Sequence, residues 1–294
     1  MGIVSNIKKD ATGGRVKLQS SEALQLEKIL NNTFFLEKDI KQEAAFVKQV
    51  MTRGAETQER VGLHASALIK GDKDFCLREQ VLSLVYRQLQ GEQISVGLKR
   101  IFEQGNAIHE KWQRLFIRAG YSGVEDLDVT RFNHNYHISF TPDIICKIPE
   151  FFEGKMVGEI KSVNTYQFQK MSKHPSAYKQ MQWYMALLIL DEMEAGTWNE
   201  VDYTKGFVLN EDKNTQDFKL EVYDYDEELC APFVERAKEI RRRYNKLIKE
   251  HKMVARPKDA TGPNCKRCED CALRNACWKI NGGGERIPKE VRVI

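Results

Sequence analysis

The sequence predicts an α/β fold in which a mixed central sheet is flanked by helices, with helical additions at the N-terminal end and a cysteine-rich segment at the C-terminal end. Three observations support this prediction. Short segments rich in β-forming residues alternate with longer segments of helical periodicity. The β-rich segments occupy the middle of the chain, so helical segments precede, separate and follow them. Four of the seven cysteines lie between residues 265 and 277.

The first part of the chain is predicted to be helical. Residues 21–52 carry apolar side chains at helical spacing and contain few helix breakers. A short extended segment, a Gly71-Asp72 turn and another helix follow between residues 61 and 89. The next helix covers residues 99–119 and ends at Gly120, because glycine is favoured where a helix terminates.

The later elements follow in the order strand, strand, helix, strand, strand, helix. They are expected at residues 136–146, 156–163, 176–193, 205–210, 218–225 and 227–251. We therefore expect an N-terminal helical extension at residues 1–60 and a main domain at residues 61–294, closed by the cysteine segment at about 260–280. A helix in the extension could dock a protein partner or promote self-association.

Composition is that of an ordinary globular protein. Of the 294 residues, 41% are hydrophobic and 30% are charged. No apolar run reaches the roughly 18 residues that suggest a membrane span, and the N-terminus lacks the apolar core of a secretory signal. We therefore expect no membrane association and a reducing cytoplasmic location, where clustered cysteines bind metal more often than they form disulfides.

Charge is distributed unevenly along the chain. Residues 231–294 carry 17 Lys and Arg against 8 Asp and Glu, whereas residues 1–230 carry 29 against 34. A basic C-terminal quarter suits a phosphate-binding surface, and nucleic acid is the natural partner. The alternative is a solvated helix with an exposed charged face.

A carboxylate and a lysine share one face of the predicted strand 156–163. Glu159 and Lys161 are two residues apart, and side chains alternate between the two faces of a strand. Asp143 ends the preceding strand, directly after Pro142, so a hairpin could bring it close to Glu159. Two carboxylates suit Mg²⁺ or Mn²⁺. The alternative is a plain charge pair on a half-exposed strand.

Three further polar side chains lie on predicted helices. His109 lies beside the apolar face of the helix at 99–119, where a histidine is more often a buried core residue than a ligand. Gln180 and Tyr184 are four residues apart on the apolar helix and therefore share a face. They could hold a phosphate or orient a lysine, or they could simply pack and hydrogen-bond locally.

The cysteine-rich segment predicts a metal site. Cys265, Cys268, Cys271 and Cys277 fall within 13 residues, and the last three form a C-x2-C-x5-C pattern. A zinc site would take these four thiolates and no residue upstream. An iron–sulfur cluster is the other candidate, and composition does not separate the two.

Together these motifs resemble the RecB-like branch of the PD-(D/E)XK nucleases, which have a restriction-endonuclease-like core. The matching segments are GNAIHEKW, TPDIIC, GEIKS and the Q-x3-Y pair of the apolar helix, and the resemblance covers residues 62–280. It implies that the catalytic metal is held by His109, Asp143, Glu159 and the backbone carbonyl of Ile160. It further implies that Lys161 is the catalytic lysine, with Gln180 and Tyr184 beside the site.

Iron–sulfur nucleases of this branch, such as the CRISPR-associated adaptation nuclease and the AddB nuclease domain, combine one upstream cysteine with a downstream C-x2-C-x5-C pattern. The resemblance therefore implies a 4Fe–4S cluster held by Cys76, Cys268, Cys271 and Cys277. Cys265 is the alternative fourth ligand. A cluster with Cys76 would tie together the two ends of the domain across a loop of about 200 residues.

The resemblance implies an Mg²⁺- or Mn²⁺-dependent DNA nuclease, expected to be an exonuclease rather than an endonuclease, that acts on single strands or duplex ends. The expected setting is a bacterial, archaeal or phage-infected cell. Two other functions are open at this point. One is an inactive nucleic-acid-binding or complex-assembly module with a zinc or iron–sulfur site, and the other is a zinc-ribbon regulatory protein in which the strand motifs are accidental.

Overall fold

The computed structural model describes residues 20–34, 40–53, 63–85, 96–170, 173–269, 271 and 273–279. Parts of the predicted N-terminal extension, residues 1–19 and 54–60, lie outside these ranges, as do residues 280–294. Within the described chain, none of the helices has the length and apolar character needed to cross a bilayer.

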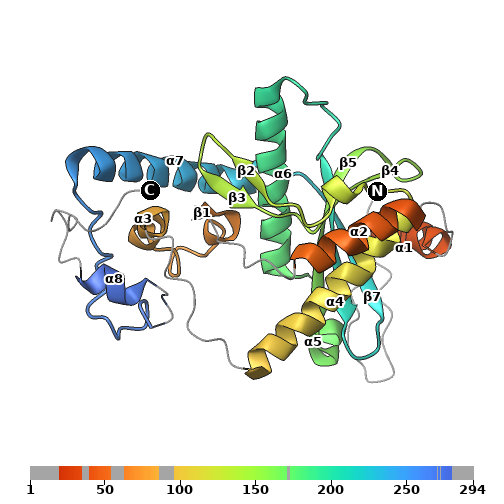
Figure 1. The fold of residues 1–294 in the computed structure, drawn as a ribbon, viewed down its shortest axis with the longest axis horizontal. Coiled ribbons are helices and arrows are strands. Elements are labelled where there is room, and N and C mark those ends of the chain that lie inside the picture. The colour runs from red at the N-terminus through yellow and green to blue at the C-terminus, as the bar shows by residue number, and fades with distance from the viewer. Residues whose placement is uncertain are drawn as a thin grey trace, which may run out of the picture.

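A four-stranded mixed sheet forms the centre of the molecule (Figure 1). Its order is β4-β5-β6-β7, with bounds Ile144–Ile148, Phe152–Val163, Lys205–Asp212 and Phe218–Asp224. The β4/β5 and β6/β7 pairs are antiparallel, whereas β5 and β6 are parallel. The parallel pair needs a crossover, and the helix α6 (Pro175–Ala195) provides it. This arrangement confirms the predicted α/β class and is consistent with a restriction-endonuclease-like core.

Two hydrophobic cores cover the two faces of the sheet. On one face, α6, α3 (Leu77–Val85) and α7 (Glu227–Glu250) pack around Val157 and Val208 of the sheet. On the other face, α4 (Val96–Arg118) packs around Ile160 and Phe207. Neighbouring strand positions thus belong to opposite cores, which is the alternation expected of a sheet buried on both faces.

The N-terminal segment contributes two helices to the second core. They are α1 (Ser21–Thr33) and α2 (Ile40–Arg53), so the single helical stretch predicted for residues 21–52 is in fact two helices. Leu26 and Leu30 of α1 and Phe46 of α2 are fully buried in the same core as Trp112 and Phe207. The apolar faces of these helices therefore pack against the central domain itself.

The remaining elements are short. A second sheet, in the order β1-β3-β2, consists of Leu63–His64, Ile138–Phe140 and Arg131–Asn133. The segment predicted as one strand at residues 136–146 therefore forms two strands, β3 and β4, with Pro142 and Asp143 between them. The other elements are the single turns η1 (Ala65–Ala67) and η2 (Val124–Asp126) and the helices α5 (Thr165–Lys170) and α8 (Arg274–Lys279).

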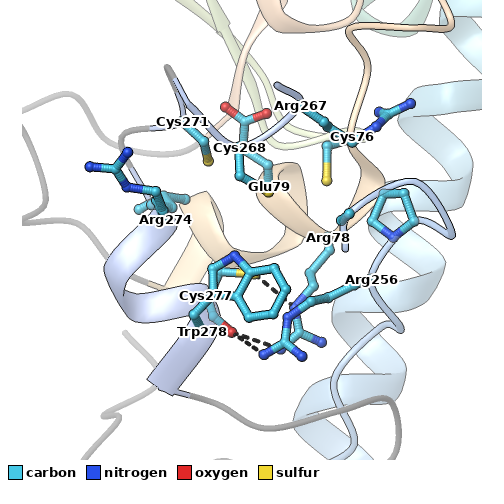
Figure 2. Close-up of a pocket in the computed structure, with 13 residues that line it drawn as sticks. Cys76, Arg78, Glu79, Arg256, Arg267, Cys268, Cys271, Arg274, Cys277 and Trp278 are labelled. Carbon is cyan, nitrogen blue, oxygen red and sulfur yellow. Dashed lines mark hydrogen bonds between the residues drawn. The ribbon is translucent and has the colours of Figure 1, made fainter. Parts of the chain in front are cut away.

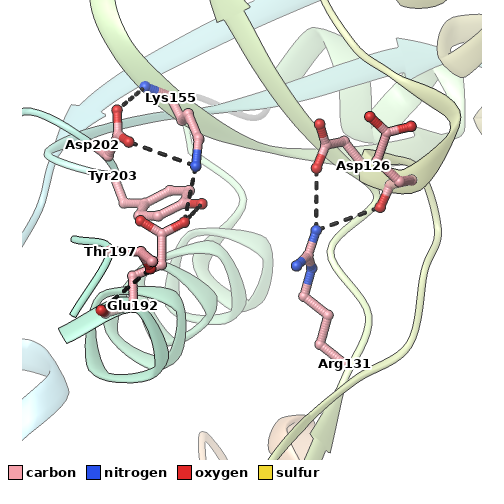
Figure 3. A network of polar contacts seen from close by, with 8 residues as sticks. Asp126, Arg131, Lys155, Glu192, Thr197, Asp202 and Tyr203 are labelled. Atoms are coloured by element: carbon pink, nitrogen blue, oxygen red, sulfur yellow. Dashed lines mark hydrogen bonds and ion pairs between the residues drawn. The ribbon is translucent and has the colours of Figure 1, made fainter. Parts of the chain in front are cut away.

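A polar network anchors the start of β5 to the C-terminal end of α6 (Figure 3). Lys155 donates its backbone N–H to Asp202 at 2.8 Å, and its Nζ lies 2.9 Å from Glu192 Oε1. Tyr203 donates its hydroxyl to the same carboxylate oxygen at 2.7 Å. These contacts hold β5 in place at the end opposite to Glu159 and Lys161, so they act on the architecture of the sheet.

Segments from the two halves of the chain meet at one end of the molecule. Figure 1 shows α3, which follows Cys76, and α8, which contains Cys277, at the end opposite to α1 and α2. Arg78 at the start of α3 donates through Nε to Cys277 Sγ at 3.1 Å, across 199 residues of sequence. The cysteine tail is therefore docked against the beginning of the main domain.

Candidate active site and cysteine pocket

The β4–β5 hairpin places Asp143 opposite Glu159. Ile144 pairs with Gly158 in the antiparallel register, so the preceding residue on one strand lies across from the following residue on the other. Asp143 Oδ2 accepts a hydrogen bond from the backbone N–H of Ile160 at 2.8 Å. The two carboxylates therefore come together because of strand pairing, as the sequence predicted.

Helix α4 adds His109 to the pair of carboxylates. His109 Nδ1 lies 3.3 Å from Asp143 Oδ1. One turn further along the helix, the buried Gln113 donates through Nε2 to the backbone carbonyl of Asp143 at 2.8 Å. Two side chains on the same face of α4 thus hold Asp143, one at its carboxylate and one at its backbone.

Glu159 and Lys161 project from one face of β5 and form an ion pair. Lys161 Nζ lies 2.5 Å from Glu159 Oε1. Glu159 is 0% exposed, and its other oxygen, Oε2, has no hydrogen-bond partner among the described residues. A buried carboxylate oxygen without a donor is costly, so this position favours a cationic ligand.

The ionisation of the four side chains is coupled through their charges. Burial and the nearby Asp143 carboxylate raise the pKa of Glu159 to about 7, against the opposing effect of Lys161. Burial also opposes the ionisation of Asp143, but His109, Lys161 and the Ile160 N–H outweigh it and hold its pKa below the usual range. In His109 the Asp143 carboxylate outweighs burial, so the pKa is raised. The charge of each group therefore shifts the pKa of its neighbours, as expected within one compact site.

Helix α6 places Gln180 and Tyr184 next to this group. Gln180 Nε2 donates to the Tyr184 hydroxyl at 3.0 Å, and Tyr184 is buried. Burial and then the carboxylates of Glu159 and Asp143 raise the pKa of Tyr184 well above its usual value. Tyr184 therefore stays a neutral hydrogen-bonding group beside the acidic residues.

The structure brings all the predicted side chains of this site together, and their roles stay predictions. Ile160 contributes its backbone N–H, while its side chain belongs to the core on the opposite face. The sequence analysis missed Gln113, although its spacing of four residues from His109 was a usable signal. It also missed His174, whose pKa is lowered by burial and by the charge of Lys161.

Neither the acidic residues nor the cysteines form a ready-made metal cage. Among the described residues, no group of three His, Cys, Asp or Glu side chains is arranged to hold an ion as it stands. In the acidic site His109 Nδ1 contacts Asp143 Oδ1, and Lys161 Nζ contacts Glu159 Oε1. A bound cation would have to replace these contacts.

The second site is a pocket lined by cysteines from both ends of the main domain (Figure 2). Cys76 comes from the segment before α3, whereas Cys268, Cys271 and Cys277 come from the tail. Burial raises the pKa of Cys76, and it raises that of Cys271 to about 11. All four predicted sulfur ligands of the iron–sulfur pattern therefore line one pocket.

Cys265 does not line this pocket in the described structure. It lies beside Cys268, with which it shares a side-chain hydrogen bond. Its backbone carbonyl accepts from the Cys268 N–H at 2.8 Å, in the turn that presents the C-x2-C-x5-C cysteines. In the described structure, Cys76 rather than Cys265 lines the pocket with the other three cysteines.

Arginines surround the cysteine pocket. Arg78 is 1% exposed; besides its contact with Cys277 Sγ, it donates to the backbone carbonyls of Val254 and Cys277. Arg256 donates to the Cys277 carbonyl at 2.8 Å and stacks on Trp278, with its guanidinium carbon 4.1 Å from the ring centre. Arg267 and Arg274 also line the pocket, together with the acidic Glu79, whose charge contributes to the raised pKa of Cys76 and of Cys271. This lining suits a group that carries negative charge, such as a metal held by several thiolates.

Comparison with known proteins gives similarity of fold only. No protein-family model matches this chain, and no curated protein matches it. Among solved structures it is similar to SSO0001, with a TM-score of 0.40 and 13% identity over 76% of this chain and 88% of that chain.

The chain is also similar to LHK-Exo, an alkaline exonuclease from Laribacter hongkongensis. The TM-score is 0.42, with 16% identity over 64% of this chain and 90% of that chain. The LHK-Exo complex with dAMP gives a TM-score of 0.44 at the same identity and coverage. At these values the similarity assigns no role to any residue of this chain.

Proposed function

We propose that this protein is a metal-dependent DNA nuclease that hydrolyses phosphodiester bonds, as an exonuclease acting on single strands or DNA ends. The observation that supports it best is that His109, Asp143, Glu159 and Lys161 lie together and that Oε2 of the buried Glu159 has no hydrogen-bond partner among the described residues. A buried group of carboxylates with one lysine is the arrangement expected where a divalent cation binds a phosphate.

The donor set fits a hard cation such as Mg²⁺ or Mn²⁺. Asp143 and Glu159 offer carboxylate oxygens, His109 offers a ring nitrogen, and Ile160 offers its backbone carbonyl. Oε2 of Glu159 is the most specific sign of fit, since no described residue donates a hydrogen bond to it. When bound, the cation lowers the pKa of a water and neutralises charge that develops on the phosphate.

Lys161 is the residue that would neutralise negative charge on the substrate phosphate. Its ammonium is partly exposed and is held by the Glu159 carboxylate, which raises the pKa of Lys161 despite its burial. It therefore stays protonated at neutral pH and offers hydrogen-bond donors to a phosphate oxygen. Tyr184 is neutral and accepts a hydrogen bond from Gln180, and we expect its hydroxyl to help orient the same phosphate.

The test is cleavage of 5′- and 3′-labelled single- and double-stranded DNA, followed over time with Mg²⁺ and with Mn²⁺. We expect metal-dependent cleavage that is lost in Glu159→Ala and in Lys161→Ala. Glu153→Ala is the matched control, since Glu153 is exposed on the same strand. Equal cleavage by both active-site variants and the wild type would contradict the proposal.

We further propose that the cysteine pocket holds a structural 4Fe–4S cluster through Cys76, Cys268, Cys271 and Cys277. The support is that four cysteines line one pocket whose other charged lining residues are four arginines and Glu79, while Cys265 lies beside Cys268 outside the lining. Thiolate ligands of this number suit either iron–sulfur or zinc. Purification without oxygen distinguishes the two. A brown protein with broad visible absorption is expected, and a colourless protein with stoichiometric zinc would rule out the cluster.

A further inference from the structure

Exposed aromatic side chains lie at one end of the candidate active site. Phe102 on α4 is 49% exposed, and Tyr166 on α5 is 67% exposed. Single exposed aromatic side chains are common on protein surfaces, so it is the position of these two near one site that carries information. A contact with the faces of nucleic-acid bases is one function that suits this position.

The direction of α4 places Phe102 beyond the catalytic end of β5. His109 contacts Asp143, which pairs with the Glu159–Ile160 level of β5. One turn earlier, a side chain added at Gly105 would lie 3.9 Å from Ser162 Oγ. Phe102 lies a further three residues back, about 4.5 Å along the axis, and on the same helical face as His109. Phe102 therefore lies level with the junction at which β5 ends and α5 begins.

Tyr166 is held in the same region by the anchoring of α5. Thr165 donates to Asp212 at 3.0 Å, and Lys219 Nζ donates to the Phe168 carbonyl at 2.7 Å. Phe168 is buried, so the helix turns one side to the protein and leaves Tyr166 on the other. The ring of Tyr166 thus faces solvent from an anchored helix, a few residues after Lys161.

Basic side chains accompany the aromatic rings. Lys170 Nζ donates to the Tyr166 hydroxyl at 2.6 Å and lies 4.0 Å from the ring centre. Lys173 lies 3.4 Å from the centre of the Tyr178 ring. The next residue is His174, whose pKa is lowered by burial and by the charge of Lys161. Tyr166 and Tyr178 are thus each accompanied by a lysine, and aromatic rings combined with ammonium groups suit a strand with exposed bases and a phosphate backbone.

We propose that Phe102 and Tyr166 form a stacking platform for the bases of single-stranded DNA, with Lys170 and Lys173 close to its phosphates. This inference rests on the proposed nuclease function and specifies its substrate. In a duplex the bases already stack on one another, so their faces are not available to a protein side chain. The platform therefore selects single strands, or the frayed end of a duplex, over intact double helix.

The test measures equilibrium binding of the full-length protein to a fluorescent single-stranded oligonucleotide and to the matching duplex, with no added Mg²⁺ or Mn²⁺. We expect Phe102→Leu and Tyr166→Leu each to weaken single-strand binding by about five- to a hundredfold, the loss of one stacked base. Duplex binding should stay unchanged. Tyr166→Phe keeps the ring and should bind nearly as the wild type does.

Matched controls remove exposed apolar side chains that are not aromatic. Ile101 is 57% exposed next to Phe102, and Met193 is 53% exposed near the end of α6. Ile101→Ala and Met193→Ala should keep wild-type affinity. Wild-type single-strand affinity in both platform variants, or an equal loss in the controls, would overturn the platform.

The two proposals fail in different ways. If Lys161→Ala abolishes cleavage while the platform variants bind normally, the nuclease stands and the platform falls. If single-strand binding depends on Phe102 and Tyr166 but no DNA is cleaved with either cation, the platform stands and the nuclease falls.

Discussion

Glu159 and Arg78 are charged side chains in almost complete burial. Each would destabilise the protein if it had no partner of opposite charge or no hydrogen bonds. Glu159 is paired with Lys161 on one oxygen, and its other oxygen has no partner in the part of the chain that the structure describes. Arg78 donates to Cys277 and to Val254. Both residues lie at candidate sites, where proteins commonly retain residues that lower stability because function requires them.

Arg78 is predicted to hold the cysteine tail in place. Replacing it in Arg78→Gln removes the guanidinium that bonds Cys277 Sγ and two backbone carbonyls. We expect a loss in the free energy of unfolding of about 2–4 kcal/mol, because these buried acceptors lose their donor. Urea unfolding measures it.

The matched control is Arg242→Gln, since the Arg242 side chain is 60% exposed and pairs with Glu239 on the helix surface. Its free energy of unfolding should change by less than about 0.5 kcal/mol. Equal stability of Arg78→Gln and wild type would show that Arg78 does not anchor the tail.

At the scale of elements, ion pairs and close backbone approaches fix the helices against the sheet. Glu43 on α2 accepts from Arg114 at 2.9 Å and from Arg118 at 2.6 Å, both on α4. The hydrogen bond from Arg118 and the charge of both arginines outweigh burial and hold the pKa of Glu43 below its usual range. The N-terminal helices are thus attached by polar contacts as well as by the core.

This pair predicts a specific pH dependence of stability. Because the folded-state pKa of Glu43 is depressed, its contribution is fully present above the unfolded-state pKa of about 4.3 and is lost as the pH falls through the folded value. Glu43→Gln should therefore cost about 1 kcal/mol at pH 7 and progressively less in acid. Unfolding curves at pH 7 and at pH 3 check this.

The control for the pH measurement is Glu235→Gln, since Glu235 is 71% exposed in its pair with Lys238. It should leave stability unchanged within about 0.5 kcal/mol at both pH values. A difference between Glu43→Gln and wild type that is the same in acid and at neutral pH would contradict the ion-pair explanation.

Gly158 permits the closest approach within the sheet. A Cβ at this position would lie 2.3 Å from Cζ of Phe207 on the neighbouring strand. Phe207 is fully buried and stacks on Phe116, with ring centres 5.7 Å apart, so it has no room to move. Gly158→Ala should therefore destabilise the protein by about 1–3 kcal/mol.

Thermal unfolding of Gly158→Ala is best compared with that of Gly262→Ala. Nothing lies within 4 Å of a Cβ at Gly262, so this variant should be neutral or slightly stabilising through the unfolded state. If both variants melt with the wild type, Phe207 is less constrained than its packing indicates.

At the scale of the whole molecule, the cysteine tail is joined to the beginning of the main domain. Arg78 contacts Cys277, and Arg267 donates to the Phe75 carbonyl at 3.0 Å. Both contacts span more than half of the chain. A metal bound to Cys76 and the tail cysteines would reinforce this closure, since restricting a loop of about 200 residues removes much conformational entropy from the unfolded chain.

The comparison of Cys76→Ala with Cys265→Ala tests this closure. We expect Cys76→Ala to lose bound metal and to unfold at a clearly lower temperature, whereas Cys265→Ala keeps both metal content and melting temperature. Iron and zinc analysis with calorimetry measures the two effects. Loss of metal in Cys265→Ala with full retention in Cys76→Ala would reverse the ligand choice.

The sequence by itself determined the local features of this protein. Strand alternation placed Glu159 and Lys161 on one face, and the predicted hairpin brought Asp143 to Glu159, as the register confirms. The α/β class and the order of the long helices and central strands also followed from periodicity, whereas the short elements β2, α5 and α8 were not predicted. Such features depend on residues that are close in sequence, where covalent geometry limits the possible structures.

Only the tertiary structure decided which distant segments meet. It divided residues 21–52 into two helices and packed both into the core of the sheet. It placed Cys76 in the tail pocket and left Cys265 out of its lining. It showed that Gln113 donates a hydrogen bond to the backbone carbonyl of Asp143 and that Arg78 donates one to the sulfur of Cys277. The physical reason is that these contacts depend on how complementary surfaces pack across many residues of chain, and no local pattern of side chains records that choice.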